Sequence, residues 1–318
     1  ELLEEEERSR VKGVIINKFR GDVSILAPGI RMLEERGGVP VVGVVPYMQI
    51  SLEDEDSLTT RFDARQEAAV DIAVIRFPRI SNFTDFSVFE QFEDVSLRYV
   101  DSVEKLHHPD MILLPGSKNT MEDLKWMRQN GLEAAILHRS AETFIFGICG
   151  GYQMMGQEVL DPEHVEGDIE RLPGLGLLPI STRMSGEKVT RQVKFGLCSP
   201  HSPSSTLHSS LMQGYEIHMG VTTPVEGTPD SPLNLLENGS TDGYCVDSTC
   251  MGTYIHGILD NPEFIDFLLA PFADKLSGNA GAFDYHTFKE EQYDRLAEHV
   301  RRHVNLPLIY QILTKNHD

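Results

Sequence analysis

The sequence predicts an α/β protein built on a mostly parallel, doubly wound sheet. Strand-like runs of Ile, Val and Leu alternate with helical segments along the chain. Its 318 residues are 40% hydrophobic and 24% charged, which is enough apolar material for a large core. A glycine-rich turn at residues 147–151, GICGG, takes an apolar strand directly into a predicted helix.

The first sixty residues predict an incomplete α/β piece. Segments 11–17 (VKGVIIN) and 39–47 (VPVVGVVPY) are strand-like, and 25–38 predicts a helix that ends at glycine. Two parallel strands do not make a stable sheet alone. We therefore expect an exposed edge and apolar face, with association or local disorder before about residue 60. The NKFRGD segment (17–22) follows a strand, where α/β sheets bind ligands, although an ordinary charged loop is the alternative.

A second domain is predicted over residues 71–318, after a linker at 61–70. Strands are expected at 71–77, 95–100, 110–116 and 143–148, and a helical segment is expected at about 120–139. From about residue 175, three segments alternate apolar with polar residues, as antiparallel additions to such a sheet do. These are KVTRQVKFGL, GYEIHMGV and CMGTYIHG, and two helices over 286–314 are assigned to the same domain.

Charge and composition exclude several classes of partner. The net charge of −21, from 28 basic and 49 acidic residues, disfavours nucleic acid and anionic membranes. No apolar run is long enough to span a bilayer and the N-terminus does not resemble a signal peptide, so we expect a soluble cytoplasmic protein. The four cysteines form no CxxC pair and no zinc-like spacing with histidine, so no metal site is expected.

Cys149 is the candidate nucleophile because it occupies the centre of the G-x-Cys-x-G turn. Such an elbow holds a nucleophile in a strained, exposed position, and the helix after it, expected from about residue 151 to 156, favours the thiolate. His256, at the end of the strand CMGTYI, is the candidate proton carrier, since Cys and His of such pairs are distant in sequence. The alternatives are an inert cysteine in a glycine-rich turn and a structural histidine.

Donors for a developing oxyanion are expected at two places. The segment 114–120, LPGSKNT, follows a buried strand and opens a helix, which leaves the amides of Gly116 and Ser117 available. The amide of Gly150, next to the nucleophile, is the second expected donor. Thr120 and Asp123 have capping-box spacing, so helix capping is a compatible alternative for this segment.

Four motifs together resemble the glutamine amidotransferase domain of the cobyric acid synthase family of cobalamin biosynthesis. The front of the chain, KGVIINKFRGD and VVGVVPY, resembles the end of that family's ATP-dependent synthetase domain, which is related to dethiobiotin synthetase. The resemblance implies a flavodoxin-like, class I glutaminase with L-glutamine as substrate, Cys149 as nucleophile and His256 as its histidine. Ammonia would pass to the synthetase domain, which uses ATP and Mg²⁺ to amidate peripheral carboxylates of adenosylcobyrinic acid a,c-diamide. The motifs are GICGGYQMMG, LPGSKNT, GYEIHMG and YIHG.

The sequence departs from the class I pattern at the residue that orients the histidine. Many class I glutaminases carry glutamate two residues after it, but position 258 is Ile. This predicts a Cys/His dyad and leaves the orienting group unidentified. Glu216 and His218 lie on one face of the GYEIHMG strand, either toward the site or with a structural role in the sheet.

The sequence contains no G-x-x-x-x-G-K-[ST] loop, so no cofactor is expected in this chain, and Asn17 is at most a remnant of a nucleotide pocket. Two other functions remain open at this point. One is a related amidotransferase that acts on cobyrinic acid or on a cell-wall lipid precursor. The other is a binding module in which the elbow is vestigial.

Overall fold

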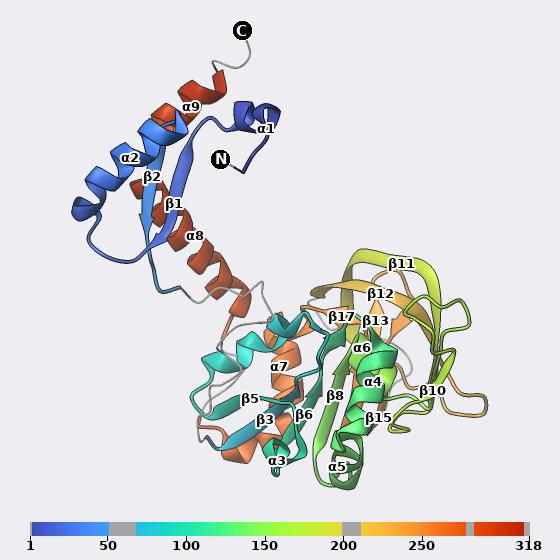
Figure 1. The fold of residues 1–318 in the computed structure, drawn as a ribbon. Helices are drawn as coiled ribbons and strands as arrows, with labels where there is room; N and C mark the ends of the chain where they lie inside the picture. The colour runs from blue at the N-terminus through green and yellow to red at the C-terminus, as the bar shows by residue number, and fades with distance from the viewer. Residues whose placement is uncertain (1, 51–67, 199–210, 248, 278–282, 315–318) are drawn as a thin grey trace. The chain divides into compact units, whose positions relative to one another are not determined.

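The computed structural model of the protein describes residues 2–50, 68–198, 211–247, 249–277 and 283–314, which form two compact units (Figure 1). The first unit comprises residues 1–52 and 286–318, and the second comprises 53–285. This division differs from the sequence prediction, which placed residues 286–314 in the second domain. Most of the predicted linker at 61–70 lies outside the described residues.

The first unit is a two-stranded parallel sheet with helices from both ends of the chain. Val14 pairs with Val41 in the ladder between β1 and β2. The C-terminal helices join this unit because their connection bonds to β2: Asn305 N donates to Val42 O at 2.7 Å, and Gly43 bridges to Val304. The elements are α1 (Glu5–Arg10), β1 (Val14–Phe19), η1 (Val23–Leu26), α2 (Ala27–Gly37), β2 (Val41–Pro46), α8 (Tyr285–His303) and α9 (Leu306–Thr314).

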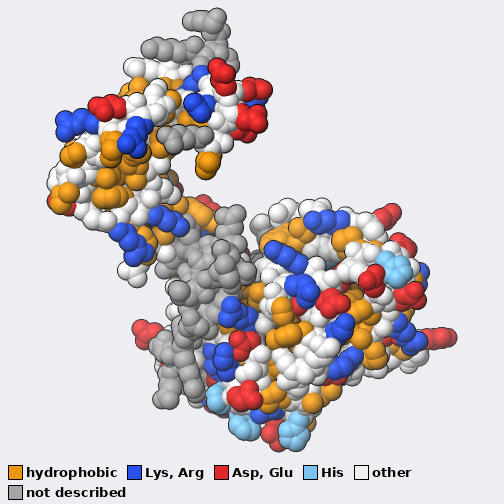
Figure 2. All heavy atoms as spheres, viewed as in Figure 1, with side chains coloured by type: hydrophobic (Ala, Val, Ile, Leu, Met, Phe, Trp, Pro, Cys, Tyr) orange, Lys and Arg blue, Asp and Glu red, His pale blue; other side chains and the backbone are white. Residues whose placement is uncertain are grey.

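Apolar side chains remain at the surface of this first unit (Figure 2). Ile15 on β1 is 46% exposed, Ile25 is 77% exposed, and no residue of α2 is buried. A sheet of two strands has too little area to cover these side chains. The exposed apolar face expected from the sequence is therefore present, whereas association through it stays a prediction.

The second unit contains a six-stranded sheet in the order β15-β16-β8-β6-β3-β5. Every neighbouring pair is parallel except β15 with β16. The sequence prediction was wrong for residues 250–253, which are not an antiparallel addition: β16 pairs with β8 in parallel, with Cys250 opposite Ile145. The bounds are β3 (Val70–Ile75), β5 (Val95–Val100), β6 (Met111–Leu114), β8 (Phe144–Ile148), β15 (Tyr244–Asp247) and β16 (Cys250–Thr253).

Helices cover both faces of this sheet, so its central strands are fully buried (Figure 1). Phe146 of β8 packs against Phe264 of α7, with ring centroids 5.6 Å apart. The next residue, Gly147, faces Tyr152 of α6, because consecutive positions on a strand point to opposite faces. The predicted helix at 120–139 is divided at Gly131, whose φ is +84°. The helices are α3 (Val103–Leu106), α4 (Thr120–Gln129), α5 (Leu132–Arg139), α6 (Gly150–Met154), α7 (Pro262–Leu269), η3 (Phe83–Gln91), η4 (Ile258–Asp260) and η5 (Ala270–Lys275).

A second, largely antiparallel sheet in the order β10-β9-β11-β12-β17 contains the long β11–β12 pair; β13 attaches to β11, and β14 attaches to β13. A short antiparallel pair, β4 with β7, follows the ends of β3 and β6. None of the helices in the described ranges combines the length and the apolar character that a membrane span requires. The strands are β4 (Ile80–Ser81), β7 (Gly116–Ser117), β9 (Glu158–Leu160), β10 (Arg171–Pro173), β11 (Ile180–Leu197), β12 (Met212–Pro224), β13 (Asn234–Leu236), β14 (Thr241–Asp242) and β17 (Ile255–His256).

Candidate active site

Cys149 lies between β8 and α6 in a conformation that few residues other than glycine adopt, with φ +53° and ψ −111°. The turn fits because its glycines leave room for neighbouring backbone. A Cβ on Gly151 would lie 2.0 Å from Leu114 O, and one on Gly150 would lie 2.9 Å from Ser117 N. The helix after the turn spans Gly150–Met154, close to the predicted range of about 151 to 156.

His256 approaches this cysteine from the second sheet. It is fully buried on β17, and the Cys149 side chain is near enough to help raise the pKa of His256. Tyr215, the cross-strand partner of His256 on β12, stacks on the ring with centroids 5.3 Å apart. The structure therefore brings together the two side chains that the sequence predicted as a pair.

Asp85 is the group that orients His256, and the sequence analysis did not find it. His256 Nδ1 donates to Asp85 Oδ2 at 2.7 Å, and Gly257 N donates to the other carboxylate oxygen at 3.2 Å. Asp85 is only 7% exposed. Since Nδ1 is engaged by the carboxylate, Nε2 is left for the sulfur, and the predicted dyad is a Cys–His–Asp arrangement in geometry.

The charge of His256 follows from these neighbours. Burial acts to lower its pKa, but the Asp85 carboxylate, assisted by Cys149, raises the pKa of His256 to about 10. The imidazole is consequently protonated at neutral pH. An imidazolium beside the sulfur is a proton donor in a fixed position.

Ser117 presents its amide to the elbow. Lys118 N donates to Arg79 O at 2.9 Å, so the adjacent pair in the β4–β7 ladder, Ile80 with Ser117, is a non-hydrogen-bonded pair. The Ser117 amide therefore points away from β4, and Gly150 lies next to it. Ser117 and Gly150 thus lie next to each other at the elbow, and both belong to the residues whose amides the sequence analysis expected as donors.

Gly116 supplies space near the histidine. By the alternation of the same ladder its amide faces β4. A Cβ at this position would lie 2.9 Å from Ser81 Oγ and 3.5 Å from His256 Cε1. The helix after this segment is capped by Asn119, which accepts from Glu122 N at 2.8 Å, so Thr120 is not the cap.

A family model described as the CobB/CobQ-like glutamine amidotransferase domain matches residues 71–264, which is more than half of the chain. The chain belongs to this family. Cobyric acid synthase of Bacteroides fragilis is 58% identical over 320 residues, which cover 99% of this chain and 62% of that protein. The same enzyme of Phocaeicola vulgatus is 52% identical over 98% of this chain and 62% of its own length. The chain therefore spans about three fifths of the length of these relatives.

A solved glutamine amidotransferase also aligns with the chain, covering 62% of it and 98% of that structure, with 15% identity and a TM-score of 0.46. The predicted α/β fold of the CobB/CobQ-like domain, with its mixed and mostly parallel sheet, is confirmed by the family match. So is the predicted class of enzyme, a glutamine amidotransferase related to cobyric acid synthases.

Glu216 and His218 lie on β12 near the site, but each has a partner in the sheet. Glu216 is 3% exposed and forms an ion pair with Arg191 of β11. The His218 ring stacks on Tyr254 with centroids 3.7 Å apart, and burial lowers the pKa of His218. These contacts favour a structural role in the CobB/CobQ-like domain for both residues.

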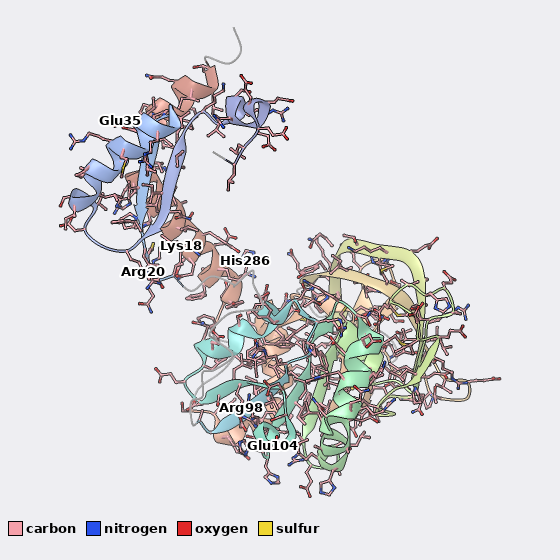
Figure 3. All side chains as sticks on the ribbon, in the orientation of Figure 1. Lys18, Arg20, Glu35, Arg98, Glu104 and His286 are labelled. Carbon is pink, nitrogen blue, oxygen red and sulfur yellow. The ribbon has the colours of Figure 1, made fainter. Side chains whose placement is uncertain are left out.

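Asn17 lies in the other unit, exposed on β1, and its Oδ1 accepts from Lys18 N at 2.9 Å. Lys18 and Arg20 lie at the end of β1 (Figure 3), and the Arg20 guanidinium covers the ring of Tyr47 at 4.1 Å. Across the described residues, no His, Cys, Asp or Glu side chains are grouped to hold a metal ion.

Asn82 and Asp85 are the site residues that sequence reasoning missed. Both come from the segment ISNFTDFSVF (80–89), where Phe83 and Phe86 are buried around Asp85. The Asn82 amide nitrogen lies 3.2 Å from both ring nitrogens of His256. A carboxylate within an aromatic run was the available signal, because a buried carboxylate requires a partner.

Proposed function

We propose that this chain hydrolyses the side-chain amide of L-glutamine, and that the whole protein uses the ammonia to amidate peripheral carboxylates of adenosylcobyrinic acid a,c-diamide. The buried Asp85–His256–Cys149 arrangement supports the first part, since it pairs a cysteine nucleophile with a proton donor of fixed orientation. The second part rests on relatives named cobyric acid synthase.

The chemistry follows from the protonation states of the two side chains. The Cys149 thiolate attacks the carboxamide carbon, and the amides of Ser117 and Gly150 hold the resulting oxyanion. The His256 imidazolium protonates the departing nitrogen, so ammonia leaves and a γ-glutamyl thioester remains. Neutral His256 then takes a proton from water, whose oxygen attacks the thioester. Glutamate leaves, and the thiolate and imidazolium are restored.

Asp85 keeps His256 in the tautomer and orientation that both steps need. With Nδ1–H held by the carboxylate, Nε2 is the only ring atom that exchanges a proton with substrate or water. Asp85 also stabilises the positive charge that His256 carries before it protonates the leaving nitrogen and regains when it takes a proton from water.

ATP and Mg²⁺ are implied for the cobyric acid synthases as a whole. The sequence has no phosphate-binding G-x-x-x-x-G-K-[ST] loop, and the described residues include no cluster of metal-ligating side chains. The glutaminase step proposed above uses only side chains and amides of this chain.

Glutamate release from L-glutamine tests the proposed glutaminase. Cys149→Ala should abolish it, whereas Cys250→Ala should not, because burial raises the pKa of the Cys250 thiol to about 12. The glutamine analogue 6-diazo-5-oxo-L-norleucine should label Cys149 alone. Hydrolysis that persists in Cys149→Ala, or equal labelling of all four cysteines in the native protein, contradicts the proposal.

A further inference from the structure

The chain passes from the six-stranded sheet to the antiparallel sheet at Tyr254. β16 ends at Thr253 in the first of these sheets and β17 begins two residues later in the second, so Tyr254 belongs to neither strand. The two side chains of the candidate site lie on opposite sides of this crossover. Cys149 N donates to Thr253 O at 2.9 Å, whereas His256 is on β17. The conformation of the crossover therefore sets how Cys149 and His256 face each other.

Side chains supply the hydrogen-bond acceptors that the crossover needs. Tyr254 N donates to Asp242 Oδ1 at 3.0 Å. Ile255 N donates to Thr253 Oγ1 at 3.0 Å, and the Thr253 hydroxyl in turn donates to Asp242 Oδ2. A buried backbone N–H without an acceptor is unfavourable, so these three contacts hold the crossover in one conformation. All of them depend directly or indirectly on the Asp242 carboxylate.

Asp242 is a buried carboxylate that the proposed mechanism does not use. It lies on β14, and Asn234 Nδ2 of β13 donates to its Oδ2 at 3.0 Å, so three donors converge on it together with Thr253 and Tyr254. Burial raises the pKa of Asp242, and the three hydrogen bonds act to lower it. An asparagine could not replace it, because an amide nitrogen would add a donor where three donors already need acceptors.

We propose that Asp242, acting through Thr253, is a positioning residue for Cys149 and His256. This inference deepens the proposed glutaminase function and rests on it. The imidazole is sensitive to the crossover because its partner, Asp85, comes from a separate element, η3, and accepts from His256 Nδ1 at 2.7 Å. A shift of β17 lengthens that hydrogen bond and moves Nε2 away from the substrate, which weakens both the charge and the aim of the proton donor.

Thr253→Val tests the proposal because valine has the shape of threonine without its hydroxyl. Ile255 N then loses its acceptor, and Asp242 loses a donor. We expect kcat for glutamine to fall about 10- to 100-fold while KM stays within about twofold. The decline of kcat/KM at high pH should begin about one pH unit lower, because a displaced His256 is held less closely by Asp85. Thr253→Ser keeps the hydroxyl and should match the wild type in both measurements.

Thr143→Val is the matched control. Thr143 is also buried, and its hydroxyl donates to Pro109 O at 3.3 Å. It directly precedes β8, at the end of the strand away from Cys149. The control should therefore lower the melting temperature without changing kcat or the pH at which kcat/KM declines.

Asp242→Asn is the second variant and has the shape of the wild-type residue. It should reduce kcat at least as much as Thr253→Val does, because one of its three donors then faces an amide nitrogen. All variants are compared well below their melting temperatures. A folded Thr253→Val or Asp242→Asn protein with wild-type kcat and pH profile overturns the positioning role and leaves the glutaminase intact, as does an equal loss in Thr143→Val. A wild-type protein that does not hydrolyse glutamine overturns the proposed function itself, and this inference with it.

Discussion

Replacing Asp85 by Asn isolates the charge of the group that orients His256. Asparagine has the same shape, and its oxygen can still accept from His256 Nδ1, so the ring keeps a partner. What is lost is the negative charge that keeps the buried ring protonated. We expect kcat/KM for glutamine to fall by about 10²- to 10⁴-fold, because the neutral amide stabilises the imidazolium less and no longer enforces the tautomer in which Nε2 serves the substrate.

The size of the effect follows from the pKa of His256, which is raised from 6.5 to about 10. At about 1.4 kcal/mol per unit, the environment favours the imidazolium by on the order of 5 kcal/mol. Burial opposes this rise in pKa. The two Asp85 interactions raise the pKa of His256 more than the two Cys149 interactions do. Removing the carboxylate should therefore cost more than half of the shift, or about two pKa units.

Measuring kcat/KM for glutamine between about pH 6 and 10.5 reveals the shift. Activity requires the His256 proton, so the wild-type profile should decline only as the pH approaches about 10. The Asp85→Asn profile should decline about two pH units lower. Asp101→Asn, which removes a surface carboxylate paired with Lys105, should leave the profile in place. If the alkaline limb of Asp85→Asn coincides with that of the wild type, the charge argument is refuted.

Three further predictions concern stability and association. Gly151→Ala should reduce the melting temperature sharply and abolish glutamine hydrolysis, because the new methyl would lie 2.0 Å from Leu114 O. Gly186→Ala is the control and should be tolerated, because no atom lies within 4 Å of the new methyl. The raised pKa of His256 stabilises the fold fully below its unfolded value of 6.5, so the melting temperature should decline as pH rises from there to about 10, and a flat profile over that window would contradict the assignment. Ile15→Lys, on the exposed face of β1, should shift the protein toward monomer in sedimentation velocity; equal association of both proteins would exclude this face.

The central strands could be predicted because they carry a local signal. Residues 143–148 were expected as a strand and form β8 over Phe144–Ile148, since a strand buried on both faces is nearly all apolar. Which strands pair with each other was not predictable from a local signal. Residues 250–253 alternate in polarity, but their partner, β8, lies about a hundred residues earlier, and its register follows from tertiary packing. Likewise, the pattern of residues 286–314 predicts helices without specifying the core against which they pack.

The same distinction applies to the candidate site: residues with a local sequence signal could be predicted, and a residue brought in by tertiary packing could not. Cys149 has a local signature, because the close approach of β6 and β7 to the turn requires glycines beside it. His256 was predictable as a strand-end residue next to glycine. Asp85 is 171 residues from His256, and no spacing rule connects them. Its only sign in the sequence is a carboxylate between phenylalanines, which predicts burial with a partner but does not say which partner.

A proton carrier requires an acceptor at Nδ1, and the chemistry does not specify which part of the chain supplies it. Position 258, where many class I glutaminases have glutamate, is a fully buried isoleucine in this protein. Asp85 reaches the same ring nitrogen from η3 and also accepts from Gly257 N, so one carboxylate fixes both the imidazole and the backbone that follows it. A glutamate at 258 would bring a second buried carboxylate to an imidazolium whose charge is already paired, and burying that unpaired charge is unfavourable. An uncharged residue at position 258, such as this isoleucine, is therefore compatible with Asp85 as the partner of His256.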